Sequence, residues 1–590
     1  MIRDTLRVGA AGGFFRALFL PAVRGFLSGR RRDAAGRPIR AIALALLFFA
    51  SSSAAEPRHE EVLMAARDGV ELSTSIHLPA EGTPPWPSVL MRTPYGKNGG
   101  RAVAAMFVEN GYAFVAQDCR GKHGSKGVYD PFRTDHLDGY DAVEWVAKQP
   151  WSDGKVGMLG ASAPGITAQL AATQAPPHLL CAYVIVAEGS ARNQTVYMGG
   201  VYRKELNDGW LASQGAFTAI GNSVRNPASS RHWSWREMPD FHRRIRIPIF
   251  QVGGWFDIFS QGTLDNFSGL QASGAGLAAG NQKLVMGPWA HGNLGGRLRF
   301  PDSRSTEYLT GPKVRRWFDR WLKGEKNGIA REPAVLYYVL GDAETPGAPG
   351  NEWRTADSWP PPARITPYYL RSGGRLGVDP PLEKESSTSY SYDPSNPVPT
   401  MGGGNLILGG KGPLDQREIG ERSDYLRFAT EPLEAPTEVA GRIHVDLVIS
   451  SDAPDTDFAA KLVDVYPDGY EALLTDGIIR TRYREGIDRE VFLLPGEAVD
   501  VRIDLWSTAV VFGRGHRIAV HVTSSNDPRF DPNPNTGKPL RSGSEKRVAK
   551  NTIHHDAKRL SKVLLPVTRT YPAGPPPDQP SEPAGSPKQP

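Results

Sequence analysis

Between residues 62 and 290, short apolar runs alternate with segments of helical periodicity. The runs predict strands at 87–91, 112–117, 156–159, 179–186, 249–252 and 284–286. The intervening segments carry apolar residues at helical spacing and predict helices at 103–110, 137–149 and 166–173. Strands that alternate with helices of about ten to fifteen residues are typical of a parallel sheet covered by helices. The pattern therefore predicts an α/β domain.

Two stretches depart from this pattern. Residues 189–244 are rich in Trp and Arg, follow helical spacing and carry no strand signal, which predicts a helical cap inserted into the α/β domain. After residue 355, short alternating strands recur between turn signals, for example at 442–448 and 517–522. That pattern is typical of a β-sandwich with Greek-key or jelly-roll connections. We expect an α/β domain over 56–188 and 245–355, and a β-sandwich over 356–570.

The two ends of the chain differ from the domains. Five arginines between residues 30 and 40 precede the apolar run 41–50, and small residues follow at 53–55. This order predicts a secretory signal over residues 1–55, cleaved near Ala55, and a periplasmic or secreted protein. An amphipathic or buried helix is the alternative. Ten apolar residues are too few to span a bilayer, so no stable membrane anchor is expected. The Pro-rich stretch 571–590 predicts a disordered tail.

Composition narrows the function classes. The 69 Lys and Arg residues against 63 Asp and Glu give a net charge of +6, and the excess lies mainly near the two ends. No basic stripe typical of a nucleic-acid-binding face is present, so no nucleic-acid partner is expected. The only cysteines, Cys119 and Cys181, lie in apolar runs and are expected to be buried free thiols rather than one bridge. We find no HExxH-type ligand spacing, and predict neither a metal nor a cofactor.

Ser162 occupies the most informative position. The strand at 156–159 leads into Gly160-Ala161-Ser162-Ala163-Pro164-Gly165 and then into a helix. Strand, tight turn of small residues and helix together make a nucleophile elbow, which exposes the serine hydroxyl above the sheet. The N–H groups of the following helix then point toward any oxyanion formed there. The alternative is an ordinary serine that caps a helix.

Candidate partners for the serine follow two later strands. A nucleophilic serine needs a base, and the base needs a carboxylate to orient it. In α/β-hydrolases the order is Ser, Asp or Glu, His, each past a strand end. Asp257 follows the strand 249–252 and His291 follows the strand 284–286. A loop-capping role is the alternative for Asp257.

Tyr95 follows the strand at 87–91, where this fold supplies a second oxyanion donor. Many hydrolases use a backbone N–H there, and a phenolic hydroxyl aimed at the developing charge serves the same purpose. On the pattern alone, Tyr95 is more typical of an aromatic residue packed in a turn.

Several further motifs occur in order along the chain. They are Arg92-Thr93-Pro94-Tyr95-Gly96-Lys97, Gln117-Asp118-Cys119-Arg120-Gly121, Trp151-Ser152-Asp153-Gly154-Lys155-Val156-Gly157-Met158, Gly253-Gly254-Trp255-Phe256-Asp257, Gly287-Pro288-Trp289-Ala290-His291, Asp455-Thr456-Asp457-Phe458, Arg514-Gly515-His516-Arg517 and Ser524-Ser525-Asn526. On these motifs, the chain resembles the cocaine esterase and X-Pro dipeptidyl-peptidase-like serine hydrolases, which include the α-amino acid ester hydrolases. The resemblance covers about residues 60–567.

The resemblance implies a role for each candidate. Ser162 is the implied nucleophile, His291 the base and Asp257 its orienting carboxylate. The Tyr95 hydroxyl and the Ala163 N–H are the implied oxyanion hole. The implied architecture is an α/β-hydrolase domain with a helical cap insertion, followed by a C-terminal jelly-roll β-sandwich.

Two departures from the family pattern concern the substrate. The family usually has Tyr after the serine, where this chain has Ala163, and the 95 residues from Ser162 to Asp257 predict a small cap. Both favour an open acyl pocket, for which we expect Trp255 and Trp289 as walls.

A peptidase of this family needs a carboxylate partner for a substrate ammonium. Glu188 is the first candidate, with Glu205 and Asp208 in the cap. The alternative for Glu188 is neutralisation by Arg192, four residues later.

The sequence thus predicts an exported serine hydrolase that cleaves small-molecule acyl esters or amides through an acyl-enzyme on Ser162. Simple acyl esters are expected to react faster than Xaa-Pro amides, partly because an alkoxide or phenoxide leaves more easily. The alternatives are an X-Pro dipeptidyl-peptidase and a catalytically inactive hydrolase-fold protein whose β-sandwich binds a ligand. The oligomeric state is not predicted.

Overall fold

The computed structural model describes residues 58–572. The predicted signal segment lies outside the described residues, as does the predicted tail from residue 573. The chain divides into two compact units, the first ending at Tyr183 and including Thr306–Asn327, and the second comprising Val184–Ser305 and the chain from Gly328. Among residues 58–572, no helix has the length and apolarity needed to cross a membrane.

The first unit is a sheet with helices. Its strand order is β1-β2-β4-β3-β5-β6, with β3 parallel to β4 and β5. The hairpin of β1 and β2 joins β4 in antiparallel fashion. The elements are β1 (Arg58–Ala65), β2 (Glu71–Leu78), β3 (Trp86–Thr93), α2 (Arg101–Val108), β4 (Ala113–Asp118), α3 (Asp135–Ala147), β5 (Ser152–Ala161), α4 (Ala163–Ala172), β6 (Leu179–Ile185), α9 (Ser305–Leu309) and α10 (Pro312–Leu322).

Burial explains why these segments read as apolar runs. Every residue of β4 is buried, as expected for a strand covered by helices on both faces. Every residue of α4 is buried as well. The helices α3 and α4 approach closely, because a Cβ at Gly139 would lie 2.6 Å from the Cβ of Ala171. Close packing of this kind fixes α4, which begins directly after Ser162.

The second unit begins with the cap region and continues as a four-stranded α/β layer. The order is β9-β10-β11-β12, with β9, β10 and β11 parallel and β12 antiparallel. The elements are β7 (Tyr197–Met198), β8 (Val201–Tyr202), α5 (Lys204–Ser213), α6 (Phe217–Arg225), α7 (Met238–Phe241), β9 (Ile249–Phe256), α8 (Ser260–Ser273), β10 (Lys283–Ala290), β11 (Val335–Val339) and β12 (Glu352–Ala356).

The cap contains a short β-hairpin, although the sequence pattern predicted only helices there. The strands β7 and β8 form a hairpin around Gly199-Gly200, whose φ angles are 52° and 80°. Two positive φ angles are typical of the tight turns that match the twist of a hairpin, and Gly adopts them without strain. Strands of two residues are too short to produce an alternating pattern, so only the Gly-Gly pair marked this turn.

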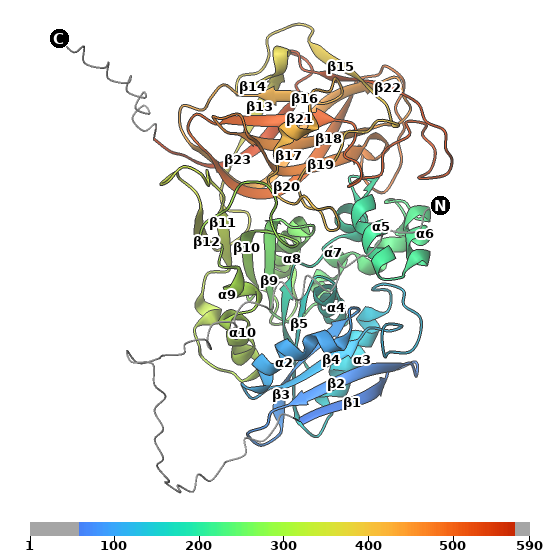
Figure 1. The fold of residues 1–590 in the computed structure, drawn as a ribbon, viewed down its shortest axis with the longest axis vertical. Helices are drawn as coiled ribbons and strands as arrows, with labels where there is room; N and C mark the ends of the chain where they lie inside the picture. The colour runs from blue at the N-terminus through green and yellow to red at the C-terminus, as the bar shows by residue number, and fades with distance from the viewer. Residues whose placement is uncertain (1–57, 573–590) are drawn as a thin grey trace, which may run out of the picture. The chain divides into compact units, whose positions relative to one another are not determined.

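The rest of the second unit is the β domain, which Figure 1 shows as a group of yellow, orange and red strands. Eleven strands pair in it, in the order β15-β22-β17-β23-β13-β14-β16-β21-β18-β19, with β20 on β17. They are β13 (Arg364–Arg371), β14 (Arg375–Gly377), β15 (Ser387–Tyr392), β16 (Leu426–Ala429), β17 (Thr437–Ser451), β18 (Asp457–Val465), β19 (Glu471–Arg480), β20 (Val499–Phe512), β21 (Arg517–Thr523), β22 (Ala549–His554) and β23 (Lys562–Thr570).

The predicted fold class is confirmed. The chain has an α/β-hydrolase domain with a helical cap insertion, followed by a jelly-roll β-sandwich. Inward side chains such as Ile443, Val445 and Leu447 alternate along β17 and enter one buried apolar cluster. Cys119 and Cys181 are buried free thiols, as predicted, and burial raises the pKa of both.

Candidate active site

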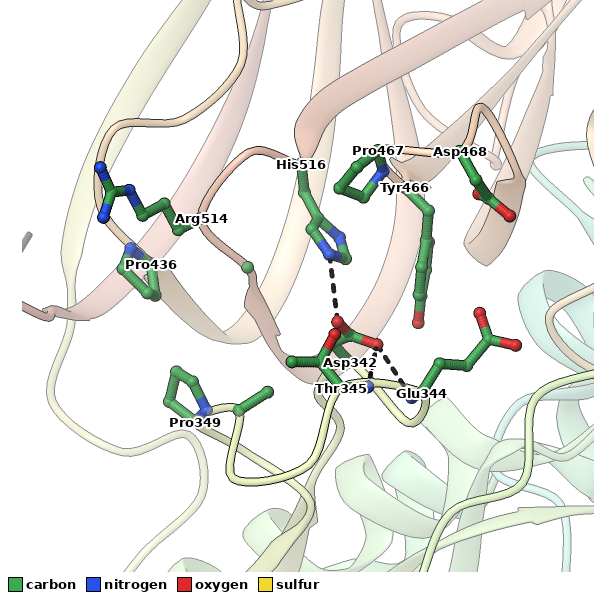
Figure 2. A pocket seen from close by; sticks show the side chains of 12 residues that line it. Asp342, Glu344, Thr345, Pro349, Pro436, Tyr466, Pro467, Asp468, Arg514 and His516 are labelled. Atoms are coloured by element: carbon green, nitrogen blue, oxygen red, sulfur yellow. Dashed lines mark hydrogen bonds and ion pairs between the residues drawn. The ribbon is translucent and has the colours of Figure 1, made fainter. Parts of the chain in front are cut away.

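A cavity of about 410 Å³ lies in the second unit and contains none of the predicted catalytic residues. Figure 2 shows His516 beside Asp342, with Tyr466 nearby. His516 Nδ1 lies 2.9 Å from Asp464 Oδ1, and its Nε2 lies 3.6 Å from Asp342 Oδ2. This buried group joins the loop after β11 to the β domain.

Ser162 has the backbone conformation of a nucleophile elbow. Its φ is 60° and its ψ is −127°, a strained combination for a residue with a Cβ. It lies between β5 and α4, and its side chain makes no capping hydrogen bond to the helix. That last observation counts against the alternative of an ordinary helix cap.

Small residues around Ser162 permit this turn. A Cβ at Gly160 would lie 2.2 Å from the backbone of Pro164, so only glycine fits there. Pro164 lies in the first turn of α4, where a missing N–H costs nothing. Ala163 keeps its N–H at the start of the helix and is buried. The elbow therefore follows from the identity of three flanking residues.

Tyr95 lies in a turn that hydrogen bonds hold on both sides. The side chain is half-buried, and the Tyr95 N–H donates to Thr93 Oγ1 at 3.0 Å. The buried Asp118 carboxylate accepts the N–H groups of Lys97 at 2.6 Å and Gly124 at 3.2 Å. The turn after β3 is thus tied to the turn after β4, which restricts the position of Tyr95.

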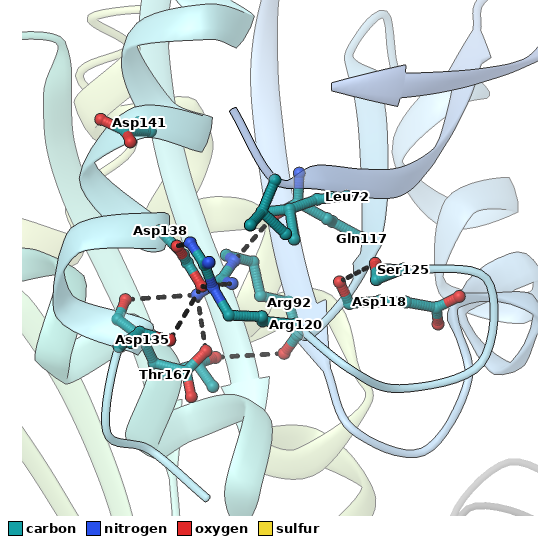
Figure 3. A network of polar contacts seen from close by, with 12 residues as sticks. Leu72, Arg92, Gln117, Asp118, Arg120, Ser125, Asp135, Asp138, Asp141 and Thr167 are labelled. Carbon is teal, nitrogen blue, oxygen red and sulfur yellow. Dashed lines mark hydrogen bonds and ion pairs between the residues drawn. The ribbon is translucent and has the colours of Figure 1, made fainter. Parts of the chain in front are cut away.

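A buried polar network links the strand before Tyr95 to the helix after Ser162 (Figure 3). The Arg92 guanidinium lies 2.8 Å from Asp135 Oδ1 in α3 and donates to Gln117 Oε1 at 2.8 Å. The Thr167 hydroxyl of α4 donates to the Arg92 carbonyl at 3.1 Å. Charged groups buried in this way need such partners. The network fixes β3, α3 and α4 relative to one another.

In the second unit, Asp257 and His291 form a buried pair. Asp257 follows β9 and His291 follows β10, and they are 2% and 3% exposed. Asp257 Oδ2 lies 2.7 Å from His291 Nδ1, while Oδ1 accepts the Phe259 N–H at 2.7 Å. A carboxylate only accepts, so the imidazole proton lies on Nδ1 and Nε2 is left as the basic nitrogen. This pair has the geometry of a base with its orienting group.

Lys411 contacts the His291 backbone, and the sequence did not predict this residue as part of the site. Its ammonium donates to the His291 carbonyl at 2.9 Å. The sequence feature that could have indicated this loop is its set of glycines, at 402–404, 409, 410 and 412. Such a set is typical of a loop with an unusual backbone conformation.

The two tryptophans expected to wall the acyl pocket have structural contacts. Trp255 is 3% exposed, donates its indole N–H to the Tyr338 carbonyl at 2.7 Å and packs on Trp359 in the core. A side chain so placed offers no surface to a substrate, so the expected role of Trp255 is not supported. Trp289 is half-buried, donates to the Ser303 carbonyl at 3.1 Å and packs on Trp353.

The carboxylates proposed to bind an ammonium already have partners. Glu188, 1% exposed, forms a two-point ion pair with Arg236, with 2.5 Å between Nη2 and Oε2. The sequence analysis gave neutralisation of Glu188 by Arg192 as the alternative. Glu188 is indeed paired, but with Arg236, because Arg192 pairs with Asp488.

The two carboxylates of the cap have partners as well. Asp208 accepts the Tyr202 hydroxyl and pairs with Arg541. Glu205 accepts three backbone N–H groups at residues 406–408. These contacts argue against an ammonium site at Glu188.

Comparisons with known proteins agree with this architecture. Residues 68–223 and 216–293 match the model of the X-Pro dipeptidyl-peptidase S15 family, and residues 327–564 match the X-Pro dipeptidyl-peptidase C-terminal non-catalytic domain. The cocaine esterase of Rhodococcus sp. strain MB1 Bresler is 34% identical, over 86% of this chain and 98% of the esterase.

Two solved structures are similar over most of their length. An aminopeptidase from a marine sediment Thaumarchaeota archaeon has a TM-score of 0.74 and 26% identity, covering 90% of this chain and 99% of that one. An α-amino acid ester hydrolase has a TM-score of 0.72 and 26% identity, covering 92% of this chain and 100% of that one. The chain is thus a serine hydrolase, and it belongs to the family of cocaine esterase and the X-Pro dipeptidyl-peptidase-like enzymes.

Proposed function

We propose that the protein is an exported serine hydrolase that cleaves small acyl esters, with Ser162, His291 and Asp257 as its triad. The observation that carries this proposal is the strained conformation of Ser162 at the start of α4. Strain of this kind persists where the surrounding structure maintains it, typically at reactive residues. The buried pair of Asp257 and His291 supports the other two roles.

In the proposed reaction, Ser162 Oγ attacks the substrate carbonyl carbon while His291 Nε2 takes the hydroxyl proton. Asp257 stabilises the imidazolium that forms. The tetrahedral oxyanion receives hydrogen bonds from the Tyr95 hydroxyl and the Ala163 N–H. Collapse breaks the ester bond, and the leaving alcohol takes the proton from His291. Water then attacks the acyl-enzyme with His291 again as base, which releases the acid and restores Ser162.

The carboxylates of the second unit support the proposed preference for esters. An Xaa-Pro substrate carries an α-ammonium that needs a carboxylate partner once it leaves water. Glu188 is neutralised by Arg236, and Glu205 is occupied by backbone donors. A neutral acyl group makes no such demand. Dipeptidyl-peptidase activity is the second candidate, favoured by the family model that matches residues 68–293.

Labelling with a fluorescent organophosphonate tests the nucleophile, since such probes react with an activated serine. We expect one label per chain, located by peptide mapping at Ser162 and absent from Ser162→Ala. Ser213→Ala, which removes an exposed serine of α5, is the matched control and should label normally. Absence of labelling in the natural chain would support the inactive binding protein instead.

Relative turnover tests the substrate class. We expect kcat/KM for a p-nitrophenyl acyl ester to exceed that for an Ala-Pro p-nitroanilide. A preference for the anilide that disappears in Glu188→Gln would instead make the enzyme a dipeptidyl-peptidase.

Export has its own test. Amino-terminal sequencing of the protein from the producing cell's periplasm or medium should give a start near Glu56. Recovery in the cytoplasm with residues 1–55 intact would contradict export.

A further inference from the structure

A glycine-rich loop, residues 402–412, packs against the backbone of the Asp257 and His291 pair; we call it the support loop. Its neck is closed by two hydrogen bonds between Gly403 and Gly412, of 2.9 and 3.0 Å. Their φ angles are 79° and 86°, which residues with a Cβ rarely adopt. The neck therefore depends on glycine at both positions.

Two side chains hold the rest of the support loop. Asn405 Nδ2 donates to the carbonyls of Gly402 and Gly410, at 2.8 Å each. The buried Glu205 of α5 accepts the N–H groups of three successive residues at 406–408, and those at Leu406 and Leu408 lie 2.9 Å away. A carboxylate that accepts several backbone N–H groups forms strong, charge-assisted hydrogen bonds. The loop is thus fixed at its neck and at its tip.

The support loop meets both members of the pair. A Cβ at Gly404 would lie 3.1 Å from the Asp257 carbonyl oxygen, so the two backbones are in close contact. On the other side, the Lys411 ammonium donates to the His291 carbonyl at 2.9 Å. Burial lowers the pKa of Lys411, while the Glu205 and Asp257 carboxylates oppose that shift.

The position of His291 explains why such support matters. The last pairing of β10 with β9 joins Ala290 to Phe256, and it follows a register irregularity after Gly287. His291 lies one residue beyond that pairing, between Ala290 and Gly292, whose N–H donates to the Ala290 carbonyl at 2.7 Å. The next residue, Gly292, has a φ of 128°. The hydrogen bond from Lys411 adds a restraint on the His291 carbonyl itself.

We propose that Lys411 is a positioning residue that holds the His291 backbone, so that this part of the C-terminal domain contributes to turnover. The proposal rests on the proposed role of His291 as base. Lys411 acts through His291 and touches no reacting atom. Because a misplacement of about 1 Å can cost roughly 10²-fold in rate, a partial loss of position costs about tenfold.

The test compares Lys411→Met, which keeps the aliphatic stem, with Lys411→Arg, which keeps a cationic donor. With a p-nitrophenyl acyl ester, we expect kcat to fall about tenfold in Lys411→Met, with KM changed less than about twofold, and to recover largely in Lys411→Arg. The rate of organophosphonate labelling at Ser162 should fall in parallel with kcat. Lys546→Met is the matched control, since it removes an ammonium that donates to the Pro394 carbonyl, and it should leave kcat unchanged.

A folded Lys411→Met variant with normal kcat would overturn the proposal, and so would an equal loss in Lys411→Arg. A lowered Tm with unchanged kcat in Lys411→Met would show that Lys411 stabilises the fold and does not position His291. If Lys411→Met fails to fold, Glu205→Gln tests the proposal instead, because it loosens the support loop while Lys411 remains. A normal kcat in Glu205→Gln would contradict the proposal. Turnover by His291→Ala would instead refute the proposed function, which separates the two failures.

Discussion

At the scale of single residues, the proposed chemistry depends on groups held by their backbone neighbours. Ser162 is the sharpest case, because its conformation comes from the small residues around it rather than from its own side chain. His291 depends in turn on Asp257 for its tautomer. Substitutions that change one functional group and little volume are therefore informative here.

Replacement of Ser162 or His291 by Ala should abolish turnover without unfolding the chain. Loss of any triad member leaves the oxyanion hole and binding, which supply about 10³–10⁴-fold over water. Steady-state ester hydrolysis measures the loss, and circular dichroism checks the fold. Near-normal turnover by Ser162→Ala would show that another residue is the nucleophile.

Tyr95→Phe removes one hydroxyl from the turn after β3. Because loss of an oxyanion donor costs about 10²–10³ in rate, or ~2.7–4 kcal/mol, kcat should fall by that factor. The change in KM should be small, since the charge exists only in the transition state. Tyr369→Phe, in the β domain, serves as the control. An unchanged kcat would leave Tyr95 with a packing role only.

The residues that the sequence identified share one property. Ser162, Asp257 and His291 each follow a strand end, which is the signal that made them candidates. Trp255 and Glu188 also lie near strand ends, yet their contacts come from Tyr338 and Arg236, 83 and 48 residues later in the chain. Partners so distant in sequence leave no local pattern.

At the scale of elements, the strands β3 to β6, β9 and β10 and the helices α2 to α4 were predictable because their apolar runs are buried, whereas β1, β2, β11, β12, α8 and α10 were not predicted. The prediction for 249–252 extends in the structure to β9, Ile249–Phe256, since glycines at 253 and 254 ended the apolar run. The hairpin of β7 and β8 was missed because its strands have two residues each. Hydrophobic periodicity needs more residues than that to be visible.

Gly160→Ala tests the junction of β5 and α4. The added Cβ would lie 2.2 Å from the backbone of Pro164, so the elbow must shift. We expect the free energy of unfolding to fall by about 1–3 kcal/mol, typical of an overpacked site, together with a marked loss of kcat. Urea unfolding and ester hydrolysis measure the two effects.

Gly543→Ala is the control for that experiment, because no atom of a residue beyond its two chain neighbours lies within 4 Å of the added Cβ. It should change neither quantity. Full activity of Gly160→Ala would mean that the turn tolerates a different backbone and that its glycine is not required.

At the scale of the whole molecule, the second unit is one compact unit that includes the cap region, part of the α/β layer and the β domain. Within this unit, the group of Asp464, His516 and Asp342 connects the β domain to the loop after β11. Burial alone lowers the pKa of His516, but the hydrogen bond and charge of Asp464, with the charge of Asp342, raise it above its ordinary value. The link is therefore pH-dependent.

The sign of that dependence follows from linkage. A raised folded-state pKa means that the contribution of His516 to stability is complete below about pH 6.5 and is lost as pH rises through the folded-state pKa. The difference in free energy of unfolding between the natural chain and His516→Gln should thus be larger at pH 6 than at pH 9. Urea titrations at both values measure it. The lower pH of the comparison is 6 rather than a more acidic value, in order to limit protonation of Asp464. Burial raises the pKa of that carboxyl. A difference that grows with pH would contradict this account.

The strained backbone at Ser162 also bears on the stability of the chain. Sparsely populated backbone conformations cost about 1–3 kcal/mol each, and glycine adopts this one without that cost. A lineage freed from the need to hydrolyse anything would gain stability from a single exchange to glycine at this position. The Ser162 hydroxyl is thus kept at a cost in stability, which fits its proposed role as nucleophile.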